Sequence, residues 1–257
     1  MSSLPGKFVW FEHLSADIPK ARKVYDALFG GHTESMPMGG QRYSMILNGD
    51  GTTSEGIGGY RNVDASARPA WLSYVSVSDV DTSYATALAA GARGVAAPAD
   101  HGTVGRGATI TDPTGATVCL WKNTGGDRPD PPKTPIGAWC WNELWTTDDA
   151  RALAFYEKVF GYGHDSMDMG PEGTYYLLKT GEVSRGGLMH SVRPDAPSMW
   201  LPYVSVADCD ASASRAKALG GKVLMEPSDI PNVGRFAIAE DTLGAAIAFI
   251  KLAADGA

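Results

Sequence analysis

An internal repeat constrains this chain more than any other feature. In its first part, matches recur 131 positions later: Trp10, Glu12, Asp17, Tyr25, Phe29 and Gly30 return as Trp141, Glu143, Asp148, Tyr156, Phe160 and Gly161. Further along, the offset is 129, and Trp71, Tyr74–Val77 and Val104–Arg106 return as Trp200, Tyr203–Val206 and Val233–Arg235. Chance cannot keep so many matches in register, so the sequence is a duplication.

The two copies meet in a segment that favours neither helix nor strand. Residues Asn123–Pro135 read NTGGDRPDPPKTP, and paired glycines followed by four prolines are typical of a semi-rigid linker. We therefore predict one pair of modules in residues 1–122, a linker in residues 123–135, and a second pair in residues 136–257.

Each half repeats one order of elements twice. Apolar and aromatic runs such as Phe8–Leu14 and Ala138–Trp145 predict strands. Asp17 and Asp148 precede runs of helical periodicity, and a glycine follows each run, which is the pattern of an N-cap and a C-terminal stop. We expect the order βαβββ, twice in each half, and the third strand of each unit is the least clearly marked.

Composition limits the partners. The 257 residues carry a net charge of −7, with 22 basic and 29 acidic side chains, which argues against nucleic acid or an anionic membrane as a partner. Three cysteines without a CxxC spacing indicate a reducing compartment, and MSSLPGKFVWFEHL contains no signal-like apolar stretch. The sequence thus predicts a cytoplasmic protein, monomer or homodimer, that binds a small organic ligand.

Two phrases and a strand ending carry a family resemblance. The resemblance lies in the segments FEHLSADIPKARKVYDALFG, NELWTTDDARALAFYEKVFG and DPTGATVCLW, and in the loop Asp229–Arg235, which reads DIPNVGR. In these segments the sequence resembles the vicinal oxygen chelate superfamily of glyoxalases, bleomycin resistance proteins and extradiol dioxygenases. The resemblance implies an α+β fold of tandem βαβββ modules, two per half, whose curved mixed sheets enclose cavities.

The same resemblance locates the positions at which metal-using members hold their ion. In this sequence those positions are Trp10, Leu72 and Cys119 in the first half and Trp141, Leu201 and Ala248 in the second. A catalytic divalent ion needs about three protein ligands, usually His or carboxylate, and these positions offer a single thiol. We therefore expect neither a metal nor another cofactor.

Glu12 and Glu143 are the candidate catalytic residues. Each stands two positions after a tryptophan at a lost ligand position, and residues two apart on a strand share a face. A carboxylate beside an indole can serve as a general base or as a ligand anchor. A structural role, with the carboxylate bonded to a neighbouring strand or to an arginine, is equally compatible with the sequence.

The expected inner face defines a candidate ligand pocket. Its predicted lining is Trp10, Leu72, Tyr74, Cys119, Trp121, Trp141, Leu201 and Tyr203. For any single member core packing is the simpler interpretation, but as a set they favour a flat organic molecule over a phosphate. The halves differ at matched positions, such as Cys119 against Ala248 and Phe11 against Asn142, so we expect two unequal cavities.

Two further motifs have a structural and a functional interpretation. Arg106 and Arg235 could bind an anionic group, but pairing with Asp100 or Asp229 in the same half is favoured. The glycine-rich Glu55–Tyr60 lacks a complete phosphate-loop motif and indicates close backbone approach instead.

The sequence therefore favours metal-independent binding of a small aromatic or amphipathic molecule, as in bleomycin-resistance-like members. One alternative is a lyase- or isomerase-type enzyme of the same superfamily that uses Glu12 or Glu143 as a general base. Another is a metal-dependent glyoxalase or dioxygenase with atypical ligands.

Overall fold

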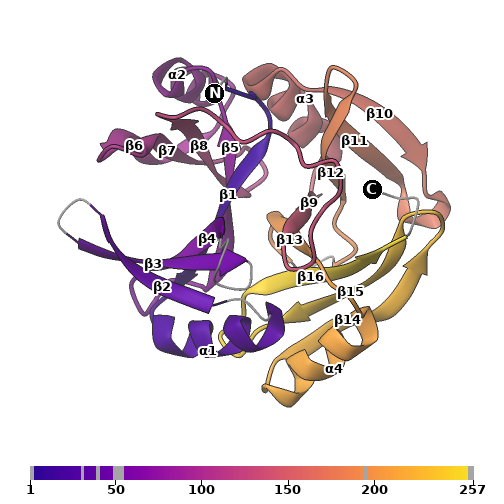
Figure 1. Cartoon of the computed structure of the whole chain (residues 1–257). Helices are drawn as coiled ribbons and strands as arrows, with labels where there is room; N and C mark the ends of the chain where they lie inside the picture. The colour runs from indigo at the N-terminus through magenta and orange to yellow at the C-terminus, as the bar shows by residue number, and fades with distance from the viewer. Residues whose placement is uncertain (1–2, 30–31, 39–40, 49–54, 194–195, 254–257) are drawn as a thin grey trace. The chain divides into compact units, whose positions relative to one another are not determined.

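The first half of the chain forms two βαβββ modules (Figure 1). A computed structural model describes residues 3–29, 32–38, 41–48, 55–193 and 196–253. The first module comprises β1 (Phe8–Ser15), α1 (Ile18–Phe29), β2 (His32–Met38), β3 (Gln41–Asn48) and β4 (Glu55–Asn62). The second comprises β5 (Ala70–Ser76), α2 (Val80–Ala89), β6 (Arg93–His101), β7 (Gly105–Thr111) and β8 (Thr117–Asn123).

The second half repeats this order. The third module comprises β9 (Trp139–Thr146), α3 (Asp149–Phe160), β10 (Gly163–Asp168), a short 3-10 helix (Gly170–Glu172), β11 (Thr174–Thr180) and β12 (Val183–His190). The fourth comprises β13 (Met199–Ser205), α4 (Cys209–Ala218), β14 (Lys222–Ile230), β15 (Gly234–Glu240) and β16 (Ala246–Leu252).

The strands form two eight-stranded mixed sheets. Their orders are β2-β3-β4-β1-β5-β8-β7-β6 and β10-β11-β12-β9-β13-β16-β15-β14. In every module the last three strands form an antiparallel meander, and its final strand pairs in parallel with the module's first strand. This confirms the predicted α+β class and the four tandem βαβββ modules.

The residues divide into two compact units that do not coincide with the two halves. Unit 1 consists of Met1–Trp10, Leu72–Pro129 and Trp141–Leu201, and therefore holds most of the second and third modules. Unit 2 consists of Phe11–Trp71, Asp130–Cys140 and Pro202–Ala257, and holds most of the first and fourth. The division at the linker stays a prediction.

The predicted helix caps Asp17 and Asp148 are present, and two further aspartates cap α2 and α4. The side chains of Asp79, Asp148 and Asp208 each accept a hydrogen bond from the backbone N–H three residues on, and Asp17 does the same for Lys20. Gly161 ends α3 in the left-handed conformation, at φ 70°; Gly30 lies outside the described residues. In the described part of the chain, no helix is both long and apolar enough to cross a membrane.

Three residues that recur in the repeat form a buried hydrogen-bond network in unit 1. The Tyr156 hydroxyl donates to Asp112 Oδ2 at 2.9 Å and accepts from Trp200 Nε1 at 2.8 Å. Asp112 Oδ1 accepts from the backbone N–H groups of residues 114–116 and so fixes the turn before β8. This buried network links a turn, a helix and a strand from three modules, which explains why these residue types recur.

Unit 2 repeats the network with one addition. Tyr25 donates to Asp241 Oδ2 at 2.9 Å and accepts from Trp71 Nε1, while fully buried His13 contacts the same Oδ2 through Nε2 at 2.8 Å. Burial opposes ionisation of Asp241, but the hydrogen bond and charge of His13 and the turn N–H groups hold its pKa below the ordinary value. Leu144 stands at the position of His13 in the third module.

Candidate functional site: two tyrosine–carboxylate pairs

Glu143 is held by neutral aromatic donors within unit 1. It lies on β9 with 7% of its surface exposed, and its Oε1 accepts from Trp145 Nε1 at 2.6 Å. Its Oε2 accepts from the Tyr175 hydroxyl at 2.8 Å, and Trp141 Nε1 donates to that hydroxyl at 2.9 Å. Both carboxylate oxygens are thereby oriented by side chains of β9 and β11.

A glycine makes this arrangement sterically possible. A Cβ at Gly187 on β12 would overlap the Tyr175 hydroxyl and lie 3.2 Å from Trp141 Nε1. Gly187 is the register partner of Glu143, so the tyrosine reaches the carboxylate across a position that must have no side chain. Burial and the Glu143 charge raise the pKa of Tyr175 well above its ordinary value, which keeps its hydroxyl a donor.

The first half contains the same arrangement of glutamate, tyrosine and glycine, and it lies in unit 2. Glu12 on β1 is 5% exposed, and its Oε1 accepts from the Tyr43 hydroxyl at 2.9 Å. A Cβ at Gly59, the register partner of Glu12, would overlap that hydroxyl. Here the second donor is a cation, since Arg61 lies 2.6 Å from Glu12 Oε2.

The two pairs therefore share a tyrosine and a glycine, and the Trp145 and Arg61 donors described above have no counterpart of the same type in the other half. Trp145 is replaced by Leu14 in the first half, whereas Arg61 is replaced by Met189 in the second. Bonding to a neighbouring strand or an arginine, the structural interpretation of both glutamates, is observed; their part in binding or catalysis remains a prediction. Tyr43 and Tyr175 were absent from the candidate set, although they lie near the start of the matched strands β3 and β11.

The predicted pocket residues fall into two exposure classes. Leu72, Tyr74, Cys119, Leu201 and Tyr203 are buried, at no more than 4% exposed. Trp10, Trp121 and Trp141 are half-buried. Tyr203 belongs to unit 2, and the other seven belong to unit 1.

Around Tyr74 the first half builds a row of rings. Tyr74 meets Trp121 with ring centroids 5.6 Å apart, and Trp121 meets His101 at 5.4 Å. In unit 2 the tyrosine has a different neighbour, since Tyr203 stacks on Phe236 of β15 at 6.5 Å. Ile250 stands at the position of Trp121 in the second half, but Phe236 supplies a ring from the adjacent strand β15.

The positions that correspond to metal ligands do not fit a divalent ion. Trp10, Trp141, Leu72 and Leu201 carry no suitable donor, and the Cys119 thiol donates to the carbonyl of Leu120. Over the residues that the structure describes, no group of three or more His, Cys, Asp or Glu side chains could hold a metal. The family's metal chemistry therefore has no matching donor set at its usual positions.

The paired arginines brace loops, as predicted. Arg106 donates to Asp100 at 2.9 Å and makes a bidentate pair with Asp81 on α2. Arg235 repeats both contacts with Asp229 and Asp210. These exposed pairs tie a hairpin to a helix in each unit.

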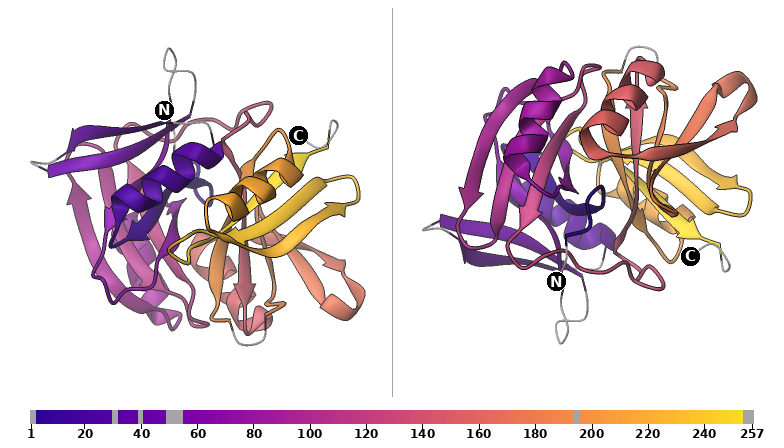
Figure 2. Two further views of the ribbon diagram at one scale, coloured as in Figure 1. Left: turned by 90° about the horizontal axis from the view of Figure 1, so that it is seen from below. Right: turned by 90° about the horizontal axis from the view of Figure 1, so that it is seen from above.

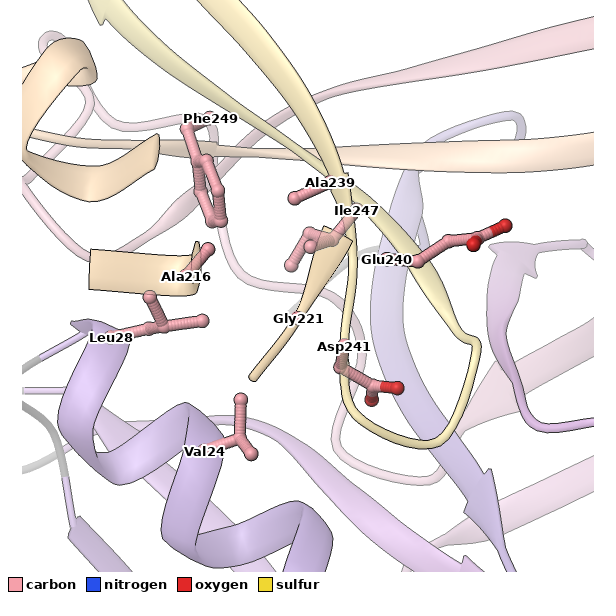
Figure 3. Close-up of a pocket in the computed structure, with 9 residues that line it drawn as sticks. All are labelled: Val24, Leu28, Ala216, Gly221, Ala239, Glu240, Asp241, Ile247 and Phe249. Atoms are coloured by element: carbon pink, nitrogen blue, oxygen red, sulfur yellow. The ribbon is translucent and has the colours of Figure 1, made fainter. Parts of the chain in front are cut away.

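A small apolar pocket in unit 2 has neither Glu12 nor Glu143 among its lining residues (Figure 3). It is lined by Val24 and Leu28 of α1, Ala216 of α4, Gly221, and Ala239, Glu240, Asp241, Ile247 and Phe249 of β15 to β16. Its volume is about 10 Å³, room for about one water, so it is a packing gap between helices.

Several named proteins are similar to this chain over nearly its full length. CFP32 of Mycobacterium tuberculosis (strain CDC 1551 / Oshkosh), whose name proposes a glyoxylase, is 38% identical over 252 residues, covering 94% of this chain and 93% of the relative. The anthracycline biosynthesis protein DauV of Streptomyces sp. (strain C5) is 29% identical over 277 residues, covering 98% of each.

Solved structures share the fold. The Mn(II)-bound glyoxalase from Novosphingobium aromaticivorans matches with a TM-score of 0.67 at 15% identity, over 97% of this chain and 83% of its own. The 2,3-dioxygenase LapB from Pseudomonas sp. KL28 matches with a TM-score of 0.64 at 12% identity, over 98% and 93%. The family model matches residues 7–120 and 141–249, and the chain belongs to the Glyoxalase/Bleomycin resistance protein/Dioxygenase superfamily.

Proposed function

We propose that this protein binds a small aromatic or amphipathic organic molecule without a metal ion. The observation that carries the proposal is the tyrosine–carboxylate pair that occurs in both halves. In each pair the glutamate lies on the same strand as the tryptophan that replaces a metal ligand of metal-using members. Sites for flat organic ligands commonly combine aromatic rings with a few fixed hydrogen-bonding groups that orient the ligand. The anthracycline biosynthesis relatives support an aromatic ligand, because an anthracycline is a fused-ring compound.

A base-catalysed reaction is the second candidate. It is favoured by the burial of Glu12 and Glu143, because a carboxylate away from bulk water is a common proton acceptor. Against it, both oxygens of Glu143 already accept hydrogen bonds from oriented donors. Such donors satisfy the anion and suit a ligand anchor better than a group that must gain a proton.

Native mass spectrometry of freshly purified protein tests binding directly. We expect an organic adduct that dissociates intact and a metal content far below one ion per chain. A stoichiometric divalent metal would replace the proposal by the metal-dependent alternative.

Turnover is tested by incubating the protein with 1,8-dihydroxyanthraquinone and analysing the mixture by mass spectrometry. Recovery of the unchanged compound after saturable binding supports a binding protein. Formation of a product that Glu143→Gln or Glu12→Gln abolishes, with Glu172→Gln as an exposed control, would establish base catalysis instead.

A further inference from the structure

We infer that Trp121 and His101 form a stacking site for a planar aromatic molecule that carries an acidic oxygen group. The inference rests on the proposed function, to which it adds the ligand class and the half of the chain that recognises it. All the residues that carry it lie in unit 1.

Strand register places three rings on one sheet face. Tyr74 is opposite Cys119, two residues before Trp121 on β8; Trp121 is opposite Gly107; and Gly105 is opposite His101. Opposite residues, and residues two apart, share a face. Tyr74, Trp121 and His101 therefore follow one another across the strands β5, β8, β7 and β6.

Two glycines and one amide fix the central indole. A Cβ at Gly105 or Gly107 would lie 2.6 Å or 2.7 Å from atoms of the Trp121 ring, so the ring rests on the β7 backbone. Trp121 Nε1 also donates to Asn123 Oδ1 at 2.8 Å. A ring held in this way loses little conformational freedom when a ligand stacks on it.

The Trp121 ring remains accessible, and the row of rings ends in the polar side chain of His101. Trp121 is half-buried and His101 is exposed, with the two ring centroids 5.4 Å apart. A planar ligand on the indole would bring a substituent within reach of the imidazole, whose N–H can donate to a carboxylate or a phenolate. Stacking gives affinity, and the imidazole selects an acidic oxygen.

In the second half the matched positions hold apolar side chains, including the position at the end of the row. Ile250, Phe236 and Ile230 occupy the places of Trp121, Gly107 and His101. Phe236 there stacks against buried Tyr203, with ring planes 26° apart. The matched face of unit 2 is thus hydrocarbon where the face of unit 1 carries an imidazole, which assigns recognition of the acidic group to the first half.

The test compares naphthalene-2-carboxylate with 2-methylnaphthalene, two probes of similar shape that differ in the acidic group. Binding to the full chain is followed by NMR through the indole N–H signals, with the Trp121 signal assigned by its absence in Gly107→Phe/Trp121→Ile. We expect both probes to shift that signal, and His101→Ala to weaken the carboxylate about tenfold. The same variant should change 2-methylnaphthalene binding by less than about twofold.

The double variant copies an arrangement that already folds in the second half, and we expect it to weaken both probes about tenfold. Ile230→Ala, the matched control, should alter neither by more than about twofold. If the wild-type chain binds the probes but the Trp121 signal stays in place, the stacking site is wrong and the proposed function stands. If it binds neither probe, both are overturned.

Discussion

At the residue scale, Asn142 of β9 occupies the place that Phe11 holds in β1. Phe11 packs on Trp139 with ring centroids 4.6 Å apart. Asn142 is 1% exposed, and neither its amide nitrogen nor its amide oxygen has a hydrogen-bond partner among the described residues. A buried polar group left in this state costs about 1–3 kcal/mol.

Asn142→Leu should therefore stabilise the protein. Leucine has a similar shape and no polar atoms, so we expect a gain of about 1 kcal/mol and a rise in Tm of about 2–4 °C in thermal unfolding. Asn123→Leu is the matched control, because Asn123 accepts from Trp121 and donates to Asp127, and it should lose stability. Equal destabilisation by both changes would show that Asn142 is satisfied.

Gly187→Ala should break the second tyrosine–carboxylate pair and leave the fold intact. The added methyl group overlaps the far end of the Tyr175 side chain, which can swing away, but only by leaving Glu143 and the Trp141 indole. We expect the indole N–H resonance of Trp141 to move upfield, and a cost of about 1–3 kcal/mol from unpaired buried groups.

Gly163→Ala serves as the control, because nothing lies within 4 Å of a Cβ at that position. It should leave the Trp141 resonance and the stability unchanged. An unmoved resonance in Gly187→Ala would mean that the glycine is not what admits the tyrosine.

The sequence predicted the site only in part. Glu12 and Glu143 were found because each stands at a fixed distance from a repeated tryptophan on the same strand. Tyr43 and Tyr175 come from another strand, and their relation to the glutamates depends on the register across β4 and β12, which a single sequence does not encode visibly. The glycine-rich motifs were the available sequence signal, because a glycine within a strand often marks a position that another group approaches closely.

At the scale of elements, the strands that were not delimited in the sequence are those at the sheet edges. β2, β6, β10 and β14 each occupy the end of a sheet, and every described residue of β10 is exposed. A strand exposed on both faces shows no alternation of apolar and polar residues, so the main sequence signal is missing. The central strands β1 and β9 were predicted within one residue, as Phe8–Leu14 and Ala138–Trp145.

The helix pairs of the two units differ in how well they fill the space beside them. In unit 2, α1 and α4 lie side by side (Figure 2), and the small pocket beside them includes Val24 and Ala239. In unit 1 the matched positions hold Phe155 and Ile110, both buried in the core of α2 and α3. Smaller side chains at these two positions explain the gap.

Ala239→Val should fill part of that gap. Added methyl groups in an apolar space contribute about 1 kcal/mol, which urea unfolding would detect as a higher midpoint at unchanged slope. Ala237→Val is the control on the same strand face, because Ala237 is fully buried and lies outside the pocket, and there it should overpack and destabilise. A loss of stability in both variants would contradict the presence of usable space.

At the scale of the whole molecule, each compact unit draws on both halves of the sequence. The core of unit 1 joins Val75, Ile110 and Leu120 from before the linker to Leu144 and Tyr156 from after it. The hydrogen bond between Tyr156 and Asp112 crosses the same boundary, as the bond between Tyr25 and Asp241 does in unit 2. The repeat in the sequence marks a duplication, whereas the buried core of each unit is shared between the two halves, so we expect folding cooperativity to follow the units.

Cutting the linker should therefore not separate the protein into two domains. Pro131 and Lys133 are exposed, so a protease site inserted between them is accessible. After cleavage we expect both fragments to elute together in size-exclusion chromatography and to part only in denaturant, because either fragment alone would expose half of each core. A site inserted at the exposed tip of the β11–β12 hairpin, at Gly181, is the control, since that cut lies within one unit. Two separately eluting, folded fragments from the linker cut would instead establish the halves as the domains.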